Sequence, residues 1–522
     1  MSLHKTFITI SSITLFSRIT GLFREILFAR VFGASIYTDA FNIAFRIPNL
    51  LRRLFAEGAF SQAFVPILTE YKNKKGDVAT KKLIDHVATV LIWFMFFICI
   101  IGIIIAPIIV YLVATGFIDN YKIFSITVSL TRIMFPYVGF MAFITLTSSI
   151  LNIWSQFKIP AFTPILLNIS CISILLLISF LIKQSIYFMA FAVILGGLLQ
   201  IIIQIPSLIK IGMFPNIKLN PSHGFKNIAV RRILKKMGPS IFSVFAAQIS
   251  LMLNTNIASK MKDGSLSCLS YADRLMEFPT ALLGVTFNTI LLPNLSKARI
   301  ESNIEEYSAI LDWSLRLTFL LAAPCSIILI TLSSALTATI FNYGKFNSES
   351  VIMTSNALIA YGIGLIGLVM VKILTPGFYA IQDIKTPIII MISVLIIIQL
   401  MNYLLVPIFA HAGLALSIGL GACLHASFLY WNLRRKRVYI PCIGWGIFFI
   451  RLIIALLLLI IISLWGNSYF NWVEMRAHPI FRIVALLLIL SFCGITYFFS
   501  LRIMGFRFKE FRYVKNLIDK EI

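Results

Sequence analysis

The stretch from Ser17 to Pro66 reads SRITGLFREILFARVFGASIYTDAFNIAFRIPNLLRRLFAEGAFSQAFVP. It is mostly apolar and long enough for two membrane spans, since about 20 apolar residues cross a hydrocarbon core. It also carries charges, namely Arg18, Arg24, Glu25, Arg30, Asp39, Arg46, Arg52, Arg53 and Glu57. A charge at membrane depth costs about 2.5–3.5 kcal/mol on insertion scales, so these side chains are expected to pair or to line a water-filled cavity. Because the excess is positive, that cavity should attract an anion.

The rest of the chain has the composition of a membrane protein. Of 522 residues, 59% are hydrophobic and only 12% are charged, whereas soluble domains average about 25% charged. Apolar runs of about 20 residues recur from end to end. The sequence therefore predicts an all-α polytopic membrane protein with about fourteen transmembrane helices.

Most of the positive charge lies in loops. A net charge of +25 would suggest nucleic acid in a soluble protein. Here the basic segments are separated by even numbers of expected helices: Lys72–Lys82, Lys210–Lys236, Arg434–Arg437 and Arg502–Lys515. The positive-inside rule then places both termini in the cytoplasm. We expect the phospholipid bilayer as a partner and no nucleic acid.

Signatures of catalysis and metal binding are missing from the sequence. The seven cysteines and six histidines show no metal-ligand spacing, and there is no CxxC, HExxH or GxxxxGK[ST] motif. His425, in an apolar run, could relay protons, but a packed neutral histidine is the favoured interpretation. We expect no catalytic residue, no metal site and no bound cofactor.

A weak internal repeat suggests duplicated halves. Pro66 and Pro293 each close an expected helix that begins with Tyr-x-Asp, and the same number of residues separates Pro160 from Pro387. Many transporters are built from such repeats. The prediction is two pseudo-symmetric six-helix lobes and two C-terminal helices: residues 1–210, a cytoplasmic linker at 211–237, residues 238–437, and residues 438–522 with a basic tail.

The arginines are the residues that could bind a ligand. A guanidinium group stays charged and matches a phosphate group bidentately. Helical spacing places Ser17, Gly21 and Arg24 on one face, with Arg18 beside it. Further polar groups follow on the second and eighth expected helices: Arg46, Asn49, Arg52 and Arg53, then Asp273, Arg274 and Glu277. Duplicated halves would bring these helices to opposite walls of one cleft.

A structural interpretation competes with this one. The arginines could form ion pairs with Asp39, Glu57, Asp273 and Glu277. The hairpin from Ser17 to Pro66 nevertheless holds more cations than anions, so pairing cannot neutralise it. Intramembrane ionisable residues are candidates for function by default, and we favour an anion site.

Several contiguous motifs carry a family resemblance. They are Ser17-Arg18-x-x-Gly21-x-x-Arg24-Glu25, Asp39-Ala40-Phe41, Arg46-Ile47-Pro48-Asn49-Leu50-Leu51-Arg52-Arg53-Leu54, Ala56-Glu57-Gly58-Ala59-Phe60, Tyr271-Ala272-Asp273-Arg274-Leu275-Met276-Glu277-Phe278-Pro279 and Leu292-Pro293-x-Leu295-Ser296. With these the chain resembles the MurJ (MviN) family of bacterial lipid II flippases, in the multidrug/oligosaccharidyl-lipid/polysaccharide exporter superfamily. The resemblance spans the whole chain, including the two C-terminal helices.

The resemblance implies a function and roles for residues. It implies that lipid II is moved from the inner to the outer leaflet of the bacterial cytoplasmic membrane by alternating access, with its tail in a groove of the last two helices. Arg18, Arg24, Arg52 and Arg274 match the substrate-binding arginines of the family. The remaining candidates would support the cavity: Ser17, Asp39, Asn49, Arg53, Glu57, Asp273 and Glu277.

The energy source for transport, the protein partners and the alternative functions remain to be considered. Some relatives bind sodium through acidic residues, but Asn254 and Asn402 stand in the corresponding helices here without an acid beside them, which favours membrane potential as the drive. Cell-wall synthesis proteins are candidate partners. One alternative is a flippase for another polyprenyl-linked oligosaccharide. A second is a cation-coupled drug antiporter, which the arginines disfavour because like charges repel. A third is a membrane enzyme acting on polyprenyl phosphates, which the short outer loops at 116–121 and 467–478 disfavour.

Overall fold

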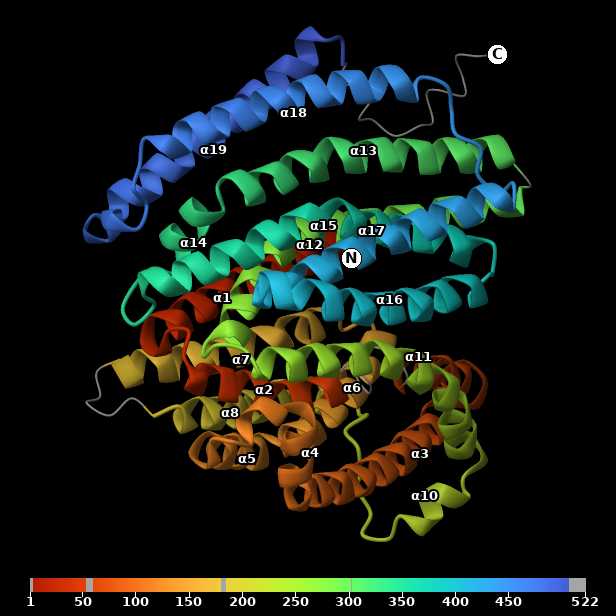
Figure 1. Ribbon diagram of the computed structural model, residues 1–522. Coiled ribbons are helices and arrows are strands. Elements are labelled where there is room, and N and C mark those ends of the chain that lie inside the picture. The colour runs from red at the N-terminus through yellow and green to blue at the C-terminus, as the bar shows by residue number, and fades with distance from the viewer. Residues whose placement is uncertain (1–2, 53–59, 180–184, 302, 507–522) are drawn as a thin grey trace. The chain divides into compact units, whose positions relative to one another are not determined.

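The computed structural model describes residues 3–52, 60–179, 185–301 and 303–506 (Figure 1). Within these ranges the regular structure is helical and contains no strand. The chain forms two compact units, Met1–Ser267 and Cys268–Ile522. Each unit is described by itself below.

The first unit consists of helices that run from the N-terminus through α11. They are α1 (Leu3–Phe32), α2 (Ile36–Arg52), α3 (Phe60–Ile104), α4 (Ala106–Val113), the 3-10 turn η2 (Thr115–Phe117), α5 (Tyr121–Met134), α6 (Tyr137–Ile153), α7 (Lys158–Ser179), α8 (Tyr187–Ile202), α9 (Ile205–Lys210), α10 (Ser222–Lys226) and α11 (Ile228–Ser259). The first residues of α12 (Ser265–Ile300) also belong to it.

The second unit contains most of α12 and the helices that follow it. They are α13 (Ile304–Thr331), α14 (Ser333–Phe341), α15 (Ser348–Ala380), α16 (Lys385–Phe409), α17 (His411–Arg435), α18 (Trp445–Ser468), the 3-10 turn η3 (Glu474–Ala477) and α19 (Pro479–Ile503).

Ten helical segments in the described ranges are long and apolar enough to cross a membrane. The helices α1, α2, α11 and α12 carry more polar residues and bring the number to the predicted fourteen. The outward faces of α16, α18 and α19 expose large aliphatic side chains, as expected for helices in contact with lipid. The prediction of an all-α polytopic membrane protein is confirmed.

The sequence predicted a basic loop at Lys72–Lys82, and this prediction is wrong. The chain is helical on both sides of this point within α3, and only Gly76 departs from helical geometry, with φ 77° and ψ 176°. Glycine adopts this positive φ without a steric penalty, while the lysines around it are good helix formers. The kink between the two helical parts of α3 therefore needs only Gly76 and no loop.

The segment between α9 and α11, predicted as a linker, lies against α3. The Asp85 carboxylate accepts a hydrogen bond from the backbone N–H of Asn216 (2.8 Å), and the Thr89 hydroxyl accepts one from that of Lys218 (3.1 Å). Trp93 Nε1 donates to the Lys218 carbonyl (3.2 Å). Since these bonds satisfy backbone groups outside any helix, the segment has a defined place on the first unit.

The core of the second unit depends on close contact between α15 and α17. A Cβ added to Gly364 would lie 2.1 Å from Gly419 Cα, so the two backbones touch where both residues lack side chains. Buried apolar residues of α12, α13, α15, α16 and α17 form one cluster, whose members on α15 and α17 follow this contact in sequence. A separate cluster joins α18 and α19 to Leu320 of α13, which fixes the C-terminal helix pair on the second unit.

Candidate functional site

The α1 face predicted from helical spacing meets a single polar residue of α7. Asn168 donates through Nδ2 to the Ser17 carbonyl (3.1 Å) and to the Thr20 hydroxyl (3.2 Å). Its Oδ1 accepts a hydrogen bond from Arg24 Nη1 (3.2 Å). A Cβ on Gly21 would lie 3.5 Å from Asn168 Nδ2, an ordinary van der Waals distance, so Gly21 faces the same amide. The shared face of Ser17, Gly21 and Arg24 is confirmed.

Arg24 is partnered within the protein. Its Nη2 lies 2.5 Å from Glu25 Oε1, and both side chains are 15% exposed. Arg24 therefore forms an ion pair, but its partner Glu25 is not one of the acids that the structural interpretation named. An incoming phosphate would have to share or displace Glu25, but it would find the guanidinium already oriented by Asn168. Arg18 on the same helix is half-buried.

Asp39 binds backbone rather than an arginine. This residue of the first turn of α2 is 4% exposed. Its Oδ2 accepts a hydrogen bond from the Gly264 N–H (2.7 Å), and its Oδ1 accepts one from the Ser267 N–H (2.7 Å) and another from the Ser267 hydroxyl. Gly264 and Ser267 stand at the start of α12, where backbone N–H groups lack helical partners. Asp39 thus caps α12 from another helix.

Further along α2 the structure describes some of the predicted residues. Arg46 donates a hydrogen bond to the Thr255 hydroxyl of α11, and Asn49 is half-buried. Arg52 is the last residue of α2, and its side chain is outside the description. Arg53 and Glu57 lie outside the described residues.

The predicted residues of α12 form an exposed, paired group. Arg274 Nη1 lies 2.8 Å from Glu277 Oε2, and the two side chains are 44% and 45% exposed. Asp273 is exposed beside them, whereas Tyr271 and Ala272 are buried. Arg274 belongs to the second unit and Arg24 to the first, so their convergence on one anion stays a prediction.

Two partners of the arginines were missed by sequence reasoning. Asn168 interrupts an apolar run, and that polar interruption was a usable signal. Thr255 stands in a mixed segment with several polar neighbours, and nothing distinguished it. Among the described residues, no three His, Cys, Asp or Glu side chains gather in a group that could hold a metal ion.

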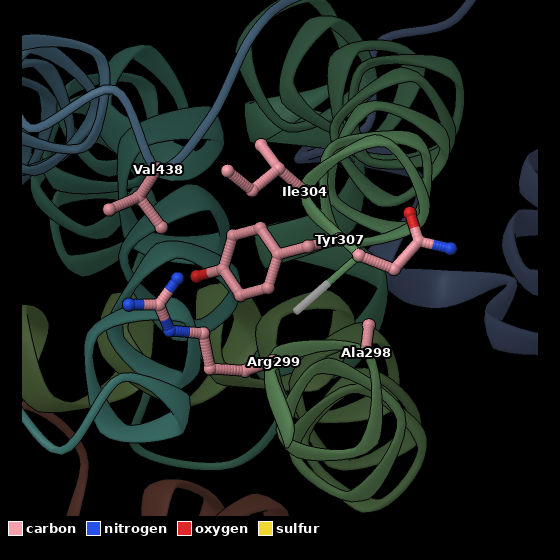
Figure 2. A pocket seen from close by; sticks show the side chains of 6 residues that line it. Ala298, Arg299, Ile304, Tyr307 and Val438 are labelled. Carbon is pink, nitrogen blue, oxygen red and sulfur yellow. The ribbon is translucent and has the colours of Figure 1, made fainter. Parts of the chain in front are cut away.

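A small pocket of about 10 Å³ in the second unit contains none of the predicted site residues. It is lined by Ala298, Arg299, Asn303, Ile304, Tyr307 and Val438. Figure 2 shows the Tyr307 hydroxyl pointing toward the side where the Arg299 guanidinium lies. That hydroxyl donates to the Gly377 carbonyl (2.7 Å). The pocket is a packing gap at the α12–α13 turn, and it does not extend the arginine site.

Comparison with known proteins decides the family. A family model described as "Lipid II flippase MurJ" matches residues 28–482, which include the motifs of α2 and α12. The chain belongs to the lipid II flippase MurJ family. Its members are transporters and not enzymes.

Curated MurJ sequences match over nearly the whole chain. The lipid II flippase MurJ of Burkholderia cenocepacia is 51% identical over 512 residues, covering 98% of this chain and 99% of that protein. A probable lipid II flippase MurJ of Buchnera aphidicola subsp. Acyrthosiphon pisum is 40% identical over 521 residues, with 98% and 99% covered.

Solved structures agree with the sequence comparison. A lipid II flippase MurJ in an inward closed conformation matches with a TM-score of 0.80 at 25% identity, covering 98% of this chain and 100% of that one. An inward-facing multidrug transporter of the MATE family in the MOP superfamily matches with a TM-score of 0.68 at 14% identity, with 83% and 98% covered. The latter likeness shows the fold alone.

Proposed function

We propose that this chain is a lipid II flippase that moves the undecaprenyl-pyrophosphate-linked peptidoglycan precursor from the inner to the outer leaflet of the cytoplasmic membrane. The observation that carries the proposal is 51% identity to a curated lipid II flippase MurJ along nearly the full length of both chains. The helices long enough to span a membrane and the MurJ-like fold support it.

The arginines of α1, α2 and α12 bind the pyrophosphate in this proposal. Arg24 is held in place by Asn168, and Arg274 presents an exposed guanidinium paired with Glu277. A guanidinium fork can exchange a carboxylate partner for a phosphate oxygen because both ligands accept two parallel hydrogen bonds. Arg18 and Arg52 complete the proposed substrate-binding set.

Alternating access supplies the movement. Within the first unit, the end of α11 is bonded to the 3-10 turn η2: Asn256 Oδ1 accepts a hydrogen bond from the Thr115 hydroxyl (3.1 Å), and Ser259 Oγ accepts one from the Gly116 N–H (3.2 Å). Shortly after the end of α11, Gly264 and Ser267 at the start of α12 are bound by Asp39. In our proposal these bonds hold one state of the transporter and break in the other.

The remaining parts of the proposal concern energy, orientation and partners. Both termini lie in the cytoplasm, as the positive-inside rule predicts. Membrane potential drives the cycle, since each elementary charge moved across about 100 mV is worth roughly 2.3 kcal/mol. Cell-wall synthesis proteins are the proposed protein partners.

The test measures the leaflet distribution of lipid II in cells depleted of this protein and supplied with a variant. Wild type restores outer-leaflet lipid II, whereas Arg24→Ala and Arg274→Ala leave it on the inner leaflet at normal protein abundance. Arg502→Ala, which removes an exposed arginine at the end of α19, is the matched control and restores transport. An unchanged lipid II distribution on depletion would contradict the substrate. Equal behaviour of all three variants would contradict the arginine site.

A further inference from the structure

Arg482 is among the largest fully buried side chains in the described part of the protein, with 0% exposure. It stands in the first turn of α19. Its Nη1 and Nη2 donate to the carbonyls of Trp472 (3.3 Å) and Asn342 (3.4 Å), and its guanidinium lies 4.8 Å from the centre of the Tyr343 ring. These contacts join α19 to the loop after α14.

Among the described residues, no acidic side chain forms an ion pair with Arg482, and Glu474, the acid nearest to it in sequence, is exposed. The N-terminal end of a helix carries a partial positive charge, which makes a cation in the first turn less favourable still. An uncompensated buried charge costs several kcal/mol, so two long hydrogen bonds and a ring face are poor compensation.

Polar atoms beside Arg482 also lack partners. Arg482 Nε is buried without a hydrogen bond, and so are both side-chain atoms of Asn342, the residue whose carbonyl accepts from Arg482. Asn342 is 0% exposed. Buried polar groups are nearly always hydrogen-bonded. A buried cation, a free N–H donor and a free amide in one place therefore indicate a missing ligand that accepts hydrogen bonds.

We propose that Arg482 and Asn342 bind a small monovalent anion such as chloride at the N-terminal end of α19. A water molecule would satisfy hydrogen bonds but leave the charge of Arg482 uncompensated. A halide compensates the charge and accepts hydrogen bonds from Arg482 Nε and Asn342 Nδ2, although it cannot donate one to Asn342 Oδ1. The complete burial of both side chains excludes a phosphate or carboxylate on a larger molecule. The bound anion ties the loop of residues 342–347 to α19 and so holds the C-terminal helix pair in place. This inference does not depend on the flippase function.

The test uses the purified full-length protein in nanodiscs. We measure Tm at fixed ionic strength while gluconate, which is too large for the site, is replaced by chloride. A ligand that binds only the folded state raises Tm with its concentration, so wild type should shift upward. Arg482→Gln should abolish the shift. Arg476→Gln should keep it, because Arg476 is an exposed arginine that donates to the Gly344 carbonyl of the same loop.

Two results would overturn the proposal. One is an equal Tm of wild type in chloride and gluconate. The other is a chloride shift that persists in Arg482→Gln. If Arg482→Gln does not fold, wild-type crystals soaked with bromide in place of chloride provide the test. An anomalous peak between Arg482 and Asn342 supports the site. The absence of that peak contradicts it.

Discussion

The carboxylate of Asp39 accepts hydrogen bonds from both the backbone N–H and the hydroxyl of Ser267, which lies 228 residues further along the chain. It accepts a third from the Gly264 N–H. One side chain of α2 thus provides the N-terminal cap of α12. The relationship explains why the first compact unit extends beyond α11 to Ser267.

Replacing Asp39 by asparagine should lower the stability of the protein. The amide keeps one acceptor oxygen and faces the other N–H donor with an NH₂ group, so one buried donor loses its partner at a cost of about 1–3 kcal/mol. Thermal unfolding of the purified protein measures the effect as a lower Tm. Asp119→Asn changes an exposed acid of the same unit and should leave Tm unchanged; equal Tm values for all three proteins would contradict the capping role.

The contact between Gly364 and Gly419 should not tolerate a methyl group. In Gly364→Ala the new Cβ would lie 2.1 Å from Gly419 Cα, and α15 would have to move away from α17. Overpacking of this kind typically costs about 1–3 kcal/mol. The control is Gly494→Ala on α19, where an added Cβ has no neighbour within 4 Å. Tm should fall for the first variant only, and a Gly364→Ala protein as stable as wild type would show that α15 and α17 are further apart.

Asp312 should be essential for the position of α18. This buried residue of α13 accepts hydrogen bonds from the Tyr439 hydroxyl (2.7 Å) and Trp445 Nε1 (2.7 Å) and pairs with Arg316 Nε (2.9 Å). Asp312→Ala leaves the Tyr439 hydroxyl and the Trp445 N–H without their acceptor, at a cost of about 1–3 kcal/mol for each buried donor, and it leaves the half-buried Arg316 without its carboxylate.

The measurement for Asp312 is limited proteolysis combined with Tm. We expect faster cleavage between α17 and α18 in Asp312→Ala. Glu305→Ala, which removes an exposed acid from the first turn of the same helix, should be cleaved like wild type. Identical cleavage of the two variants would mean that the network does not anchor α18.

Asp383 should make stability depend on pH in the acid range. Burial raises the pKa of this carboxyl, but hydrogen bonds from Lys436 and Thr386 outweigh burial and lower the pKa to about 2. A lowered pKa adds stability above the unfolded value of about 3.9, and that stability is lost as pH falls toward 2. The Tm advantage of wild type over Asp383→Asn should be full at pH 7 and shrink below about pH 4. Asp77→Asn, at an exposed acid, should match wild type at every pH; a constant difference for Asp383→Asn would refute the linkage.

Cys442 offers a direct measurement of orientation. It is the one exposed cysteine among the seven, and it lies between α17 and α18, after the basic segment Arg434–Arg437. If that side is cytoplasmic, a membrane-impermeant maleimide should label Cys442 in inside-out vesicles and not in intact spheroplasts. Cys442→Ser identifies the labelled site. Labelling in spheroplasts would reverse the predicted topology.

The sequence by itself determined the fold class and the α1 face. Long apolar runs have one low-energy solution in a bilayer, because only hydrogen-bonded helices satisfy the backbone there. The spacing of Ser17, Gly21 and Arg24 fixes a shared face through helical periodicity alone. The contiguous motifs around Arg46 and Arg274 were enough to indicate the family.

Only the tertiary structure decided the partners of these residues. Local spacing says nothing about which distant group meets a side chain: an arginine was one partner considered for Asp39, which instead binds Gly264 and Ser267. Arg24 required Asn168, which lies on α7. The loop predicted at Lys72–Lys82 proved to be a single non-helical residue, Gly76, between two helical parts of α3. Periodicity encodes the faces of helices, whereas the folded arrangement of those helices selects the contacts between them.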